Sequence, residues 1–488
     1  QEKQFYHCFG CGAHGSALGF VMNYRGLNFV EAVEELANLV GLEMPSREGE
    51  LINTPDYSPL YSALEDAQAF FIQQLRSHPQ KQRVVDYLKA RGLTGQIAKR
   101  FGIGYAPDSW DALLNHLLKA GVTQKAMIDA GLVISKSDDK TYDRFRDRVM
   151  FPIYDRRGRV VAFGGRIIDK GEPKYLNSPE TPVFRKRQEL YGLYQIRQAN
   201  VKTDRIIVVE GYMDVVGLAQ FGVENTVASL GTATTAEQLE TLFKITSEVV
   251  FCYDGDNAGM RAATRAMETV LPLIRSGRRA SFFFMPQGHD PDSFVREFGA
   301  TAFNDPDKHQ ALSEFLFEHI AKQTTMDTLD GRARFVELAK PLLAKIPEGP
   351  YKQMMQTRSA ELGQIDPQHV VSRAPTSRPP ARQRSTQSSR ARQSIVRTAL
   401  KRVLLLPRIA QDCPDLALLQ HAEDAGVTLL CEIIERAKAN PAITTGALLE
   451  AYRGEKYERG LTELLATPLE LDDESETVNF HAAIEKLL

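Results

Sequence analysis

Short apolar runs alternate with amphipathic segments between residues 204 and 284. DRIIVVEG, ENTVASLG, SEVVFCYDGD and RRASFFFMP have the length of buried strands, whereas YMDVVGLAQFG, TAEQLETLFKI and NAGMRAATRAMETV have helical spacing. Strands that alternate in this way with helices predict a parallel α/β sheet. In such sheets the active groups gather beyond the carboxyl ends of the strands.

The segments on either side of this region have other patterns. Residues 57–106 and 308–365 have helical spacing, as in LYSALEDAQAFFIQQLR. RVMFPIYD and RGRVVAFGGRII predict two strands that turn at Arg157 and Gly158. Nearer the N-terminus, NFVEAVEELANLVGL predicts a helix that Asn28 caps and Gly41 ends.

Length and composition change this picture only modestly. The 488 residues exceed one compact core and predict roughly two to four domains. The net charge of −2 does not indicate a nucleic-acid-binding protein, but a local basic face is compatible with it. Five cysteines are too few for a disulfide framework and indicate a reducing cytoplasm, with Cys252, Cys413 and Cys431 as buried core residues. The sequence contains no run of about 18 apolar residues, so no membrane span is predicted.

Acidic side chains follow three of the predicted strands. Glu210 ends the first strand, with Asp214 one turn into the next helix. The other acids lie at the ends of the third and fourth strands: Asp254, Asp256, Asp290 and Asp292. Two like charges about 6 Å apart repel by roughly 3 kcal/mol at an effective dielectric near 20, which a divalent cation would offset. A capped turn is the alternative for a single Asp-x-Asp, but three such clusters favour a Mg²⁺ or Mn²⁺ site.

The glycine between Asp254 and Asp256 has its own interpretation. Glycine allows the backbone to turn tightly after a buried strand. We therefore expect the two flanking carboxylates to face the same cation.

The motifs EGYMDV, YDGDNAGMRA and DPDSF together resemble the Toprim domain of primases, topoisomerases and some nucleases. The resemblance implies that Glu210 is an acid/base or metal-proximal group. It also implies that Asp254 and Asp256 are catalytic metal ligands and that Asp290 and Asp292 complete the acidic site.

The segments YDRFRDRVMFPI, GRVVAFGGRI and PKYLNSPETPVFRK, with the Toprim motifs, resemble the bacterial replicative primases of the DnaG type over most of the chain. The resemblance implies a ridge of nucleic-acid and nucleotide contacts opposite the acids, formed by Arg91, Arg144, Arg146, Arg148, Arg166, Lys174, Tyr175, Asn177 and Lys186. We expect Arg144, Arg146 and Arg148 to point the same way because they have strand spacing. A solvated face is the alternative for these three arginines.

The N-terminal FYHCFGCG resembles part of the primase zinc ribbon. Cys8 and Cys11 match the second half of the Zn²⁺ site, and the upstream Cys and His are absent from a chain that begins at Gln1 without Met. We therefore expect an N-terminal truncation and poor zinc binding, with His7 and His14 as non-ligands. The aromatic residues of this segment fit either stacking on template bases or a small core: Phe5, Tyr6 and Phe9.

The resulting prediction is a multidomain α/β and α protein. Its parts are a partial zinc ribbon (1–45), a mixed α+β N-terminal subdomain of the polymerase core (57–200), the Toprim parallel α/β sheet (201–296), a helical subdomain (297–366), a disordered basic linker (367–394) and a C-terminal helical domain (395–488). The linker is rich in Pro, Ser and Arg and has no acidic residue.

The resemblance implies a DNA primase, which makes short RNA primers on single-stranded DNA from ribonucleoside triphosphates by two-metal nucleotidyl transfer. It implies Mg²⁺ or Mn²⁺ at the acids and Zn²⁺ in the complete protein. A DnaB-type replicative helicase is the implied partner of residues 395–488, single-stranded DNA-binding protein is a further candidate, and no membrane is involved. The implied location is the cytoplasm, at the replication fork in the nucleoid.

Two other functions remain alternatives. A topoisomerase or Toprim nuclease would need a tyrosine nucleophile in a large following domain or a phosphate-binding loop, and no GxxxxGK[ST] occurs. A non-catalytic adaptor would bind helicase and single strands and would tolerate replacement of the acids.

Overall fold

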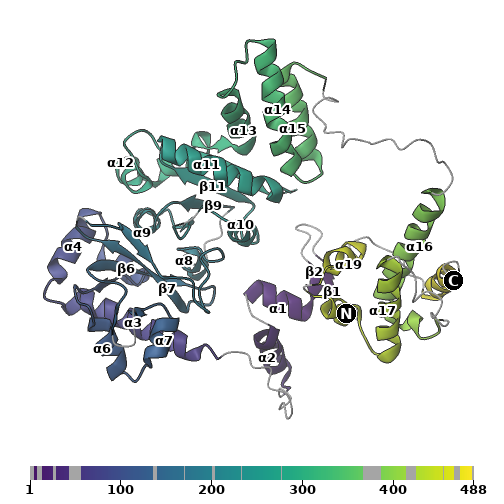
Figure 1. Cartoon of the computed structure of the whole chain (residues 1–488), viewed down its shortest axis with the longest axis horizontal. Helices are drawn as coiled ribbons and strands as arrows, with labels where there is room; N and C mark the ends of the chain where they lie inside the picture. The colour runs from purple at the N-terminus through teal and green to yellow at the C-terminus, as the bar shows by residue number, and fades with distance from the viewer. Residues whose placement is uncertain are drawn as a thin grey trace. The chain divides into compact units, whose positions relative to one another are not determined.

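The chain divides into two compact units in the computed structural model, residues 1–50 together with 375–488, and residues 51–374 (Figure 1). The structure describes residues 5–7, 14–25, 29–42, 56–135, 140–169, 171–199, 204–231, 233–275, 277–366, 386–413, 425–453, 455–465 and 473–485. In these ranges, no helix is both long and apolar enough to cross a membrane.

The N-terminal segment contains a small antiparallel pair of strands and two helices. These elements are β1 (Phe5–His7), β2 (His14–Ser16), α1 (Ala17–Arg25) and α2 (Phe29–Val40). Helix α2 ends at Gly41, whose φ of 70° suits glycine, so its predicted end is confirmed. The ring of Tyr6 meets Phe20 edge-on at 5.4 Å, but Phe20 is itself 45% exposed, so both roles of this aromatic residue stay predictions. Cys8, Phe9, Cys11 and Asn28, and the side chains of Phe5 and His7, lie outside the described residues.

The C-terminal segment is helical, as predicted. Its elements are α16 (Thr386–Leu405), η4 (Pro407–Ala410), α17 (Ala425–Ala439), α18 (Thr445–Ala451), α19 (Glu458–Leu465) and α20 (Asp473–Glu485). Cys413 and Cys431 lie in its buried core, which confirms their assignment. Helix α16 begins inside the predicted linker, and the disorder of residues 367–394 stays a prediction. Residues 386–394 follow the last proline of the linker, Pro380, and keep every backbone N–H that a helix needs.

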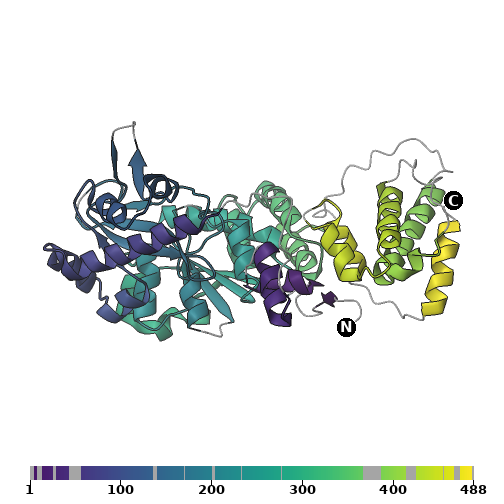
Figure 2. The same ribbon diagram turned by 90° about the horizontal axis from the view of Figure 1, so that it is seen from below.

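The N-terminal subdomain of the second unit is mixed α and β. Its antiparallel sheet has the order β3 (Gly104–Ala106), β6 (Arg148–Tyr154), β7 (Val160–Ile167) and β8 (Tyr175–Asn177). Its helices are α3 (Ser58–Ser77), α4 (Lys81–Ala90), α5 (Gly95–Arg100), α6 (Ala112–Lys119), α7 (Gln124–Asp129) and α8 (Leu193–Gln198). The turn at Gly158, with φ 85°, is confirmed. In Figure 2 the hairpin of β4 (Val133–Ser135) and β5 (Thr141–Asp143) projects from this subdomain.

The predicted parallel sheet follows. Its order is β10 (Thr226–Ala228), β9 (Arg205–Val209), β11 (Glu248–Tyr253), β12 (Arg279–Phe284) and the antiparallel, unpredicted β13 (Gln310–Ala311). The helices of this region are α9 (Tyr212–Gln220), α10 (Ala236–Leu242), α11 (Asn257–Val270), η1 (Leu271–Leu273) and α12 (Pro291–Phe303). Alternate residues of β9 enter different cores, with Ile206 and Val208 on one side and Ile207 and Val209 on the other. Helices therefore cover both faces of the sheet, and only its edges remain open for a site (Figure 1).

The helical pattern predicted for residues 308–365 is observed from Leu312 onward, after the short strand β13. It contains α13 (Leu312–Ala321), α14 (Leu329–Lys345) and α15 (Pro350–Gly363), after η2 (Pro306–Lys308). Phe315 of α13 packs on Phe282 of β12 with ring centroids 4.4 Å apart. The helical subdomain thus shares a core with the face of the sheet that α11 covers.

Candidate active site

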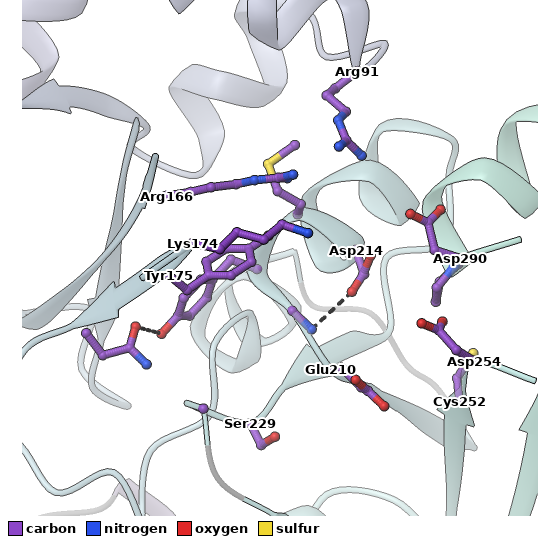
Figure 3. A pocket seen from close by; sticks show the side chains of 16 residues that line it. Arg91, Arg166, Lys174, Tyr175, Glu210, Asp214, Ser229, Cys252, Asp254 and Asp290 are labelled. Carbon is purple, nitrogen blue, oxygen red and sulfur yellow. Dashed lines mark hydrogen bonds between the residues drawn. The ribbon is translucent and has the colours of Figure 1, made fainter. Parts of the chain in front are cut away.

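Three neighbouring strand ends place acidic residues around one cavity. Strand β11 pairs in parallel with β9 on one side and β12 on the other, so Glu210, Asp254 and Asp290 meet at the carboxyl edge of the sheet. The cavity has a volume of about 320 Å³ (Figure 3). It is lined by Arg91, Arg166, Lys174, Tyr175, Asn177, Glu210, Gly211, Tyr212, Met213, Asp214, Ser229, Gly231, Cys252, Asp254, Asp290 and Pro291. The predicted convergence of the acids is confirmed for these three residues.

Asp256 faces a second, more open cavity of about 570 Å³ beside the first. Asp254 and Asp290 line both cavities. Asp256 also caps α11 by accepting a hydrogen bond of 2.7 Å from the Gly259 backbone, and Asp290 caps α12 in the same way through Ser293 at 2.7 Å. The capped-turn and acidic-site interpretations therefore apply to the same residues, because the helix caps hold the carboxylates at the edge.

Gly255 lies between the two cavity-facing aspartates for a different reason from the one predicted. It does not have a positive φ, so no left-handed turn requires it. A Cβ atom at this position would instead lie 2.3 Å from the carbonyl oxygen of Met285. Glycine is needed here because the loop after β11 runs directly against the end of β12.

Burial and mutual repulsion shape the charges of the acids. Burial, and then the charges of Asp254 and Asp256, raises the pKa of Glu210. Burial, and then the charges of Asp290 and Asp256, raises the pKa of Asp254. Burial also disfavours ionised Asp290, but hydrogen bonds from Ser293 outweigh that effect and lower the pKa of Asp290. Asp290 thus stays ionised more readily than Glu210 and Asp254.

Asp214 lines the cavity, although it was not among the predicted ligands. Its carboxylate accepts a hydrogen bond of 3.0 Å from the Gly211 backbone at the start of α9. Burial, followed by the charge of Asp290, raises the pKa of Asp214 to about 7. The sequence signal was available, because an acid three residues after a helix N-cap returns to the strand end that precedes the helix.

Asp292 differs from the other acids in its contacts. It is 1% exposed, lines neither cavity, and forms ion pairs with Arg296 at 3.3 Å and Arg91 at 3.9 Å. Its predicted role as a metal ligand stays a prediction. The observed contacts orient two arginines, one of which lines the cavity.

Cations and polar groups face the acids from the N-terminal subdomain (Figure 3). Arg166 is 6% exposed and lies between the rings of Tyr87 and Tyr175, at 5.4 and 5.3 Å. Asn177 accepts a hydrogen bond of 2.7 Å from the Tyr212 hydroxyl. Aromatic stacking and hydrogen bonds therefore hold this side of the cavity in place.

The predicted stripe of three arginines does not exist. Only Arg148 belongs to β6, and it is 6% exposed with hydrogen bonds to backbone carbonyl groups. Arg144 donates to the Gly131 carbonyl at 2.9 Å, and Arg146 stacks on Trp110 at 4.2 Å. The strand starts later than its sequence suggests, because Asp147 has a φ of 47° and interrupts the alternation. These arginines and Lys186 do not line the acidic cavity.

Comparisons with known proteins agree with this geometry. Five family models match the chain: "CHC2 zinc finger" (residues 1–51), "DNA primase catalytic core, N-terminal domain" (70–197), "Toprim-like" (207–295), "DnaB-helicase binding domain of primase" (313–368) and "DNA primase DnaG DnaB-binding" (396–488). A DNA primase from Pasteurella multocida is 43% identical over 475 residues, which cover 96% of this chain and 80% of the relative. The chain belongs to the DnaG-type bacterial DNA primases.

Two further matches delimit what the chain contains. A DNA primase from Pseudomonas putida is 53% identical over 375 residues, which cover 76% of this chain but only 57% of that primase. The chain thus spans little more than half the length of this relative. The solved structure of a DnaG primase catalytic domain bound to ssDNA is 44% identical, with a TM-score of 0.60, and the match covers 64% of this chain and 98% of that one.

The donor set of the primase cavity fits a divalent cation. Within the described part of the chain, no hydrogen bond or ion pair holds the side chains of Glu210 and Asp254, whose charges repel each other. A cation with oxygen ligands relieves that repulsion. Among the described residues, no three His, Cys, Asp or Glu side chains form a ready-made ligand group. This arrangement suits Mg²⁺, which usually keeps several waters and takes only one or two carboxylates with substrate phosphates.

The metal-free primase is expected to gain stability as the pH falls from about 8 to about 6. A carboxyl group whose pKa is raised in the folded state costs stability in full above that pKa; the cost shrinks as the pH falls below it and is gone only below the pKa of the unfolded state. For Asp214, at about 7 against a usual 3.8, the cost is on the order of 4 kcal/mol at high pH. Asp214→Asn retains an acceptor for the Gly211 amide and should remove much of this dependence.

Urea unfolding with EDTA at pH 6 and pH 8 measures the effect. Burial also raises the pKa of Glu189, which does not line the acidic cavity, to about 7. Glu189→Gln therefore serves as the comparison, because it removes a similarly shifted carboxyl group and leaves the acids of the cavity unchanged. An Asp214→Asn protein with the full pH dependence of the parent would contradict the assignment.

Proposed function

We propose that this chain carries the catalytic part of a primase, which makes RNA primers on single-stranded DNA from ribonucleoside triphosphates. The observation that carries the proposal is one cavity with acids from three strand ends on one side and Arg166 and Lys174 on the other. The first side suits a cation-bound triphosphate, and the second suits nucleic-acid phosphates. The ssDNA bound to the related catalytic domain supports the same substrate class.

In the proposed reaction the primer 3′ oxygen attacks the α-phosphorus of the incoming nucleotide. The new P–O bond forms as the bond to pyrophosphate breaks, and the 3′ hydroxyl loses its proton. Divalent cations bound at Asp254, Asp256 and Asp290 would stabilise the charge that develops on the attacking and leaving oxygens. Glu210, whose pKa is raised, would accept the proton.

The cationic side would position the strands. Lys174 is exposed at the cavity, so its ammonium group is free to move toward a phosphate. Arg166 contacts the rings of both Tyr87 and Tyr175, and its guanidinium group would offer a fork of donors to a phosphate. Tyr175 and Asn177 lie beside them, where they would contact sugar or base.

Elongation of an RNA primer annealed to a DNA template tests the function directly. The assay contains the chain, labelled ribonucleotides and either Mg²⁺ or Mn²⁺. We expect template-dependent extension that EDTA abolishes. Nicking or relaxation of plasmid DNA without extension would instead favour the nuclease or topoisomerase alternatives, and neither activity would favour the adaptor.

Lys174→Ala is expected to weaken single-stranded DNA binding to the same extent for every template sequence. Loss of one phosphate contact should reduce the slope of log K against log salt concentration by about 0.7. Fluorescence anisotropy from low to moderate salt measures this slope. The exposed Lys119, which lies on α6 and outside the cavity, provides the matched variant Lys119→Ala. Equal slopes for both variants would remove Lys174 from the template path.

We also propose that a DnaB-type helicase docks on the helical segments. The two helicase-binding models that match residues 313–368 and 396–488 support this assignment. The first range lies outside the predicted docking domain, residues 395–488. It includes helices that share a core with the catalytic sheet. Co-sedimentation of the chain with helicase, compared with the same chain ending at residue 366, would separate the two contributions.

A further inference from the structure

An apolar groove of about 500 Å³ lies on the N-terminal subdomain, away from the acidic cavity. Helices α3, α4 and α5 and the turn between α4 and α5 form its walls. The apolar lining consists of Ile72, Leu75, Val85, Leu88, Leu93, Ala98 and Ile103. The volume lies in the range of sites that hold a ligand or a few side chains of a partner.

The edge of this groove is positively charged. Arg76, Lys89 and Lys99 line it, and all three are exposed. Within the described residues, none of the three has an ion-pair partner and no acidic residue lines the groove. An apolar surface bordered by cations without counter-charges is complementary to a ligand that is both apolar and acidic.

The groove is preformed rather than loose. Leu93 is buried beneath it, and both the backbone and the hydroxyl of Thr94 donate to the Gln220 side chain of α9, at 3.1 and 2.8 Å. The same turn begins with Arg91, which lines the acidic cavity. A ligand in the groove would therefore contact the element that carries an active-site arginine.

We propose that this groove docks a short peptide segment of a partner protein, in which acidic residues flank one or two bulky apolar side chains. A single-stranded nucleic acid fits less well, because no aromatic side chain lines the groove for base stacking. The apolar lining binds the bulky side chains, and the three cations bind the carboxylates. The proposal stands independently of the primase reaction.

Fluorescence anisotropy with the whole chain and labelled ten-residue peptides tests the proposal. One peptide has two acidic residues beside a leucine and a phenylalanine; the second has amides in place of the acids, and the third has serines in place of the apolar residues. The charge-reversed variant is Arg76→Glu/Lys89→Glu/Lys99→Glu. The matched control reverses three exposed cations elsewhere: Lys119→Glu/Lys140→Glu/Arg185→Glu.

We expect only the first peptide to bind well, and its affinity to fall at least about tenfold with the groove reversal but not with the control. Ile72→Ser, which keeps every charge, should also weaken it. Absence of binding, or equal binding by the reversed variant, would overturn the proposal. The proposal would also be overturned if the reversed variant lost single-stranded DNA binding but kept peptide binding, because that result would assign the cations to nucleic acid.

Discussion

Asp254→Asn is expected to abolish primer extension, with a fall in rate of about 10³-fold or more. Asp254 follows the central strand β11 and lines both cavities of the acidic edge. The carboxylate of Asp254 repels the neighbouring acids, and a bound cation would offset that repulsion. The substitution removes this carboxylate from the proposed cation site. Transition-state stabilisation of several kcal/mol is lost with such a ligand, and each 1.4 kcal/mol corresponds to a tenfold change in rate.

The same substitution should not destabilise the metal-free protein. Burial and neighbouring charges raise the pKa of Asp254, so its ionised form already costs folding free energy at neutral pH. A neutral side chain is therefore expected to leave the thermal midpoint unchanged or to raise it, while stabilisation by added Mg²⁺ disappears. Asp307→Asn, an exposed acid outside both cavities, is the matched variant. Full extension by Asp254→Asn would exclude the carboxylate from the reaction.

Gly255→Ala is expected to lower primer extension by about 10²-fold without removing any charged group. The new methyl group would lie 2.3 Å from the Met285 carbonyl oxygen, which belongs to the backbone and has little freedom to move. The loop that holds Asp254 and Asp256 would have to shift, and a displacement near 1 Å costs rates of this order. Overpacking should also destabilise the protein by roughly 1–3 kcal/mol.

Gly95→Ala is the matched control for this substitution. A Cβ atom at Gly95 meets no atom within 4 Å, and its φ is not positive. Extension rates and urea unfolding of both variants, measured with Mg²⁺, separate a local collision from a general cost of replacing glycine. A Gly255→Ala protein with parental activity would show that the loop position does not matter for catalysis.

The amino-acid sequence by itself determined the strands and the residues at their ends. The runs that became β9, β11 and β12 are mostly apolar because both faces of a parallel sheet are buried. Glu210 and Asp254 follow the first two strands directly, and Asp290 follows β12 after a short loop. Alternation of strands and helices then placed these acids at one edge. The motifs also indicated the family.

Only the tertiary structure decided which side chains face one another. Strand order made β11 the neighbour of both β9 and β12, which no local pattern shows. Asp292 forms ion pairs with two arginines instead of lining a cavity. The positive φ of Asp147 interrupts the strand spacing that predicted a common direction for Arg144, Arg146 and Arg148. Asp214 joined the site through a helix cap, and the apolar groove arose where three helices meet. Local spacing sets the direction of a side chain within its own element, but burial and contact depend on elements that lie far apart in the chain.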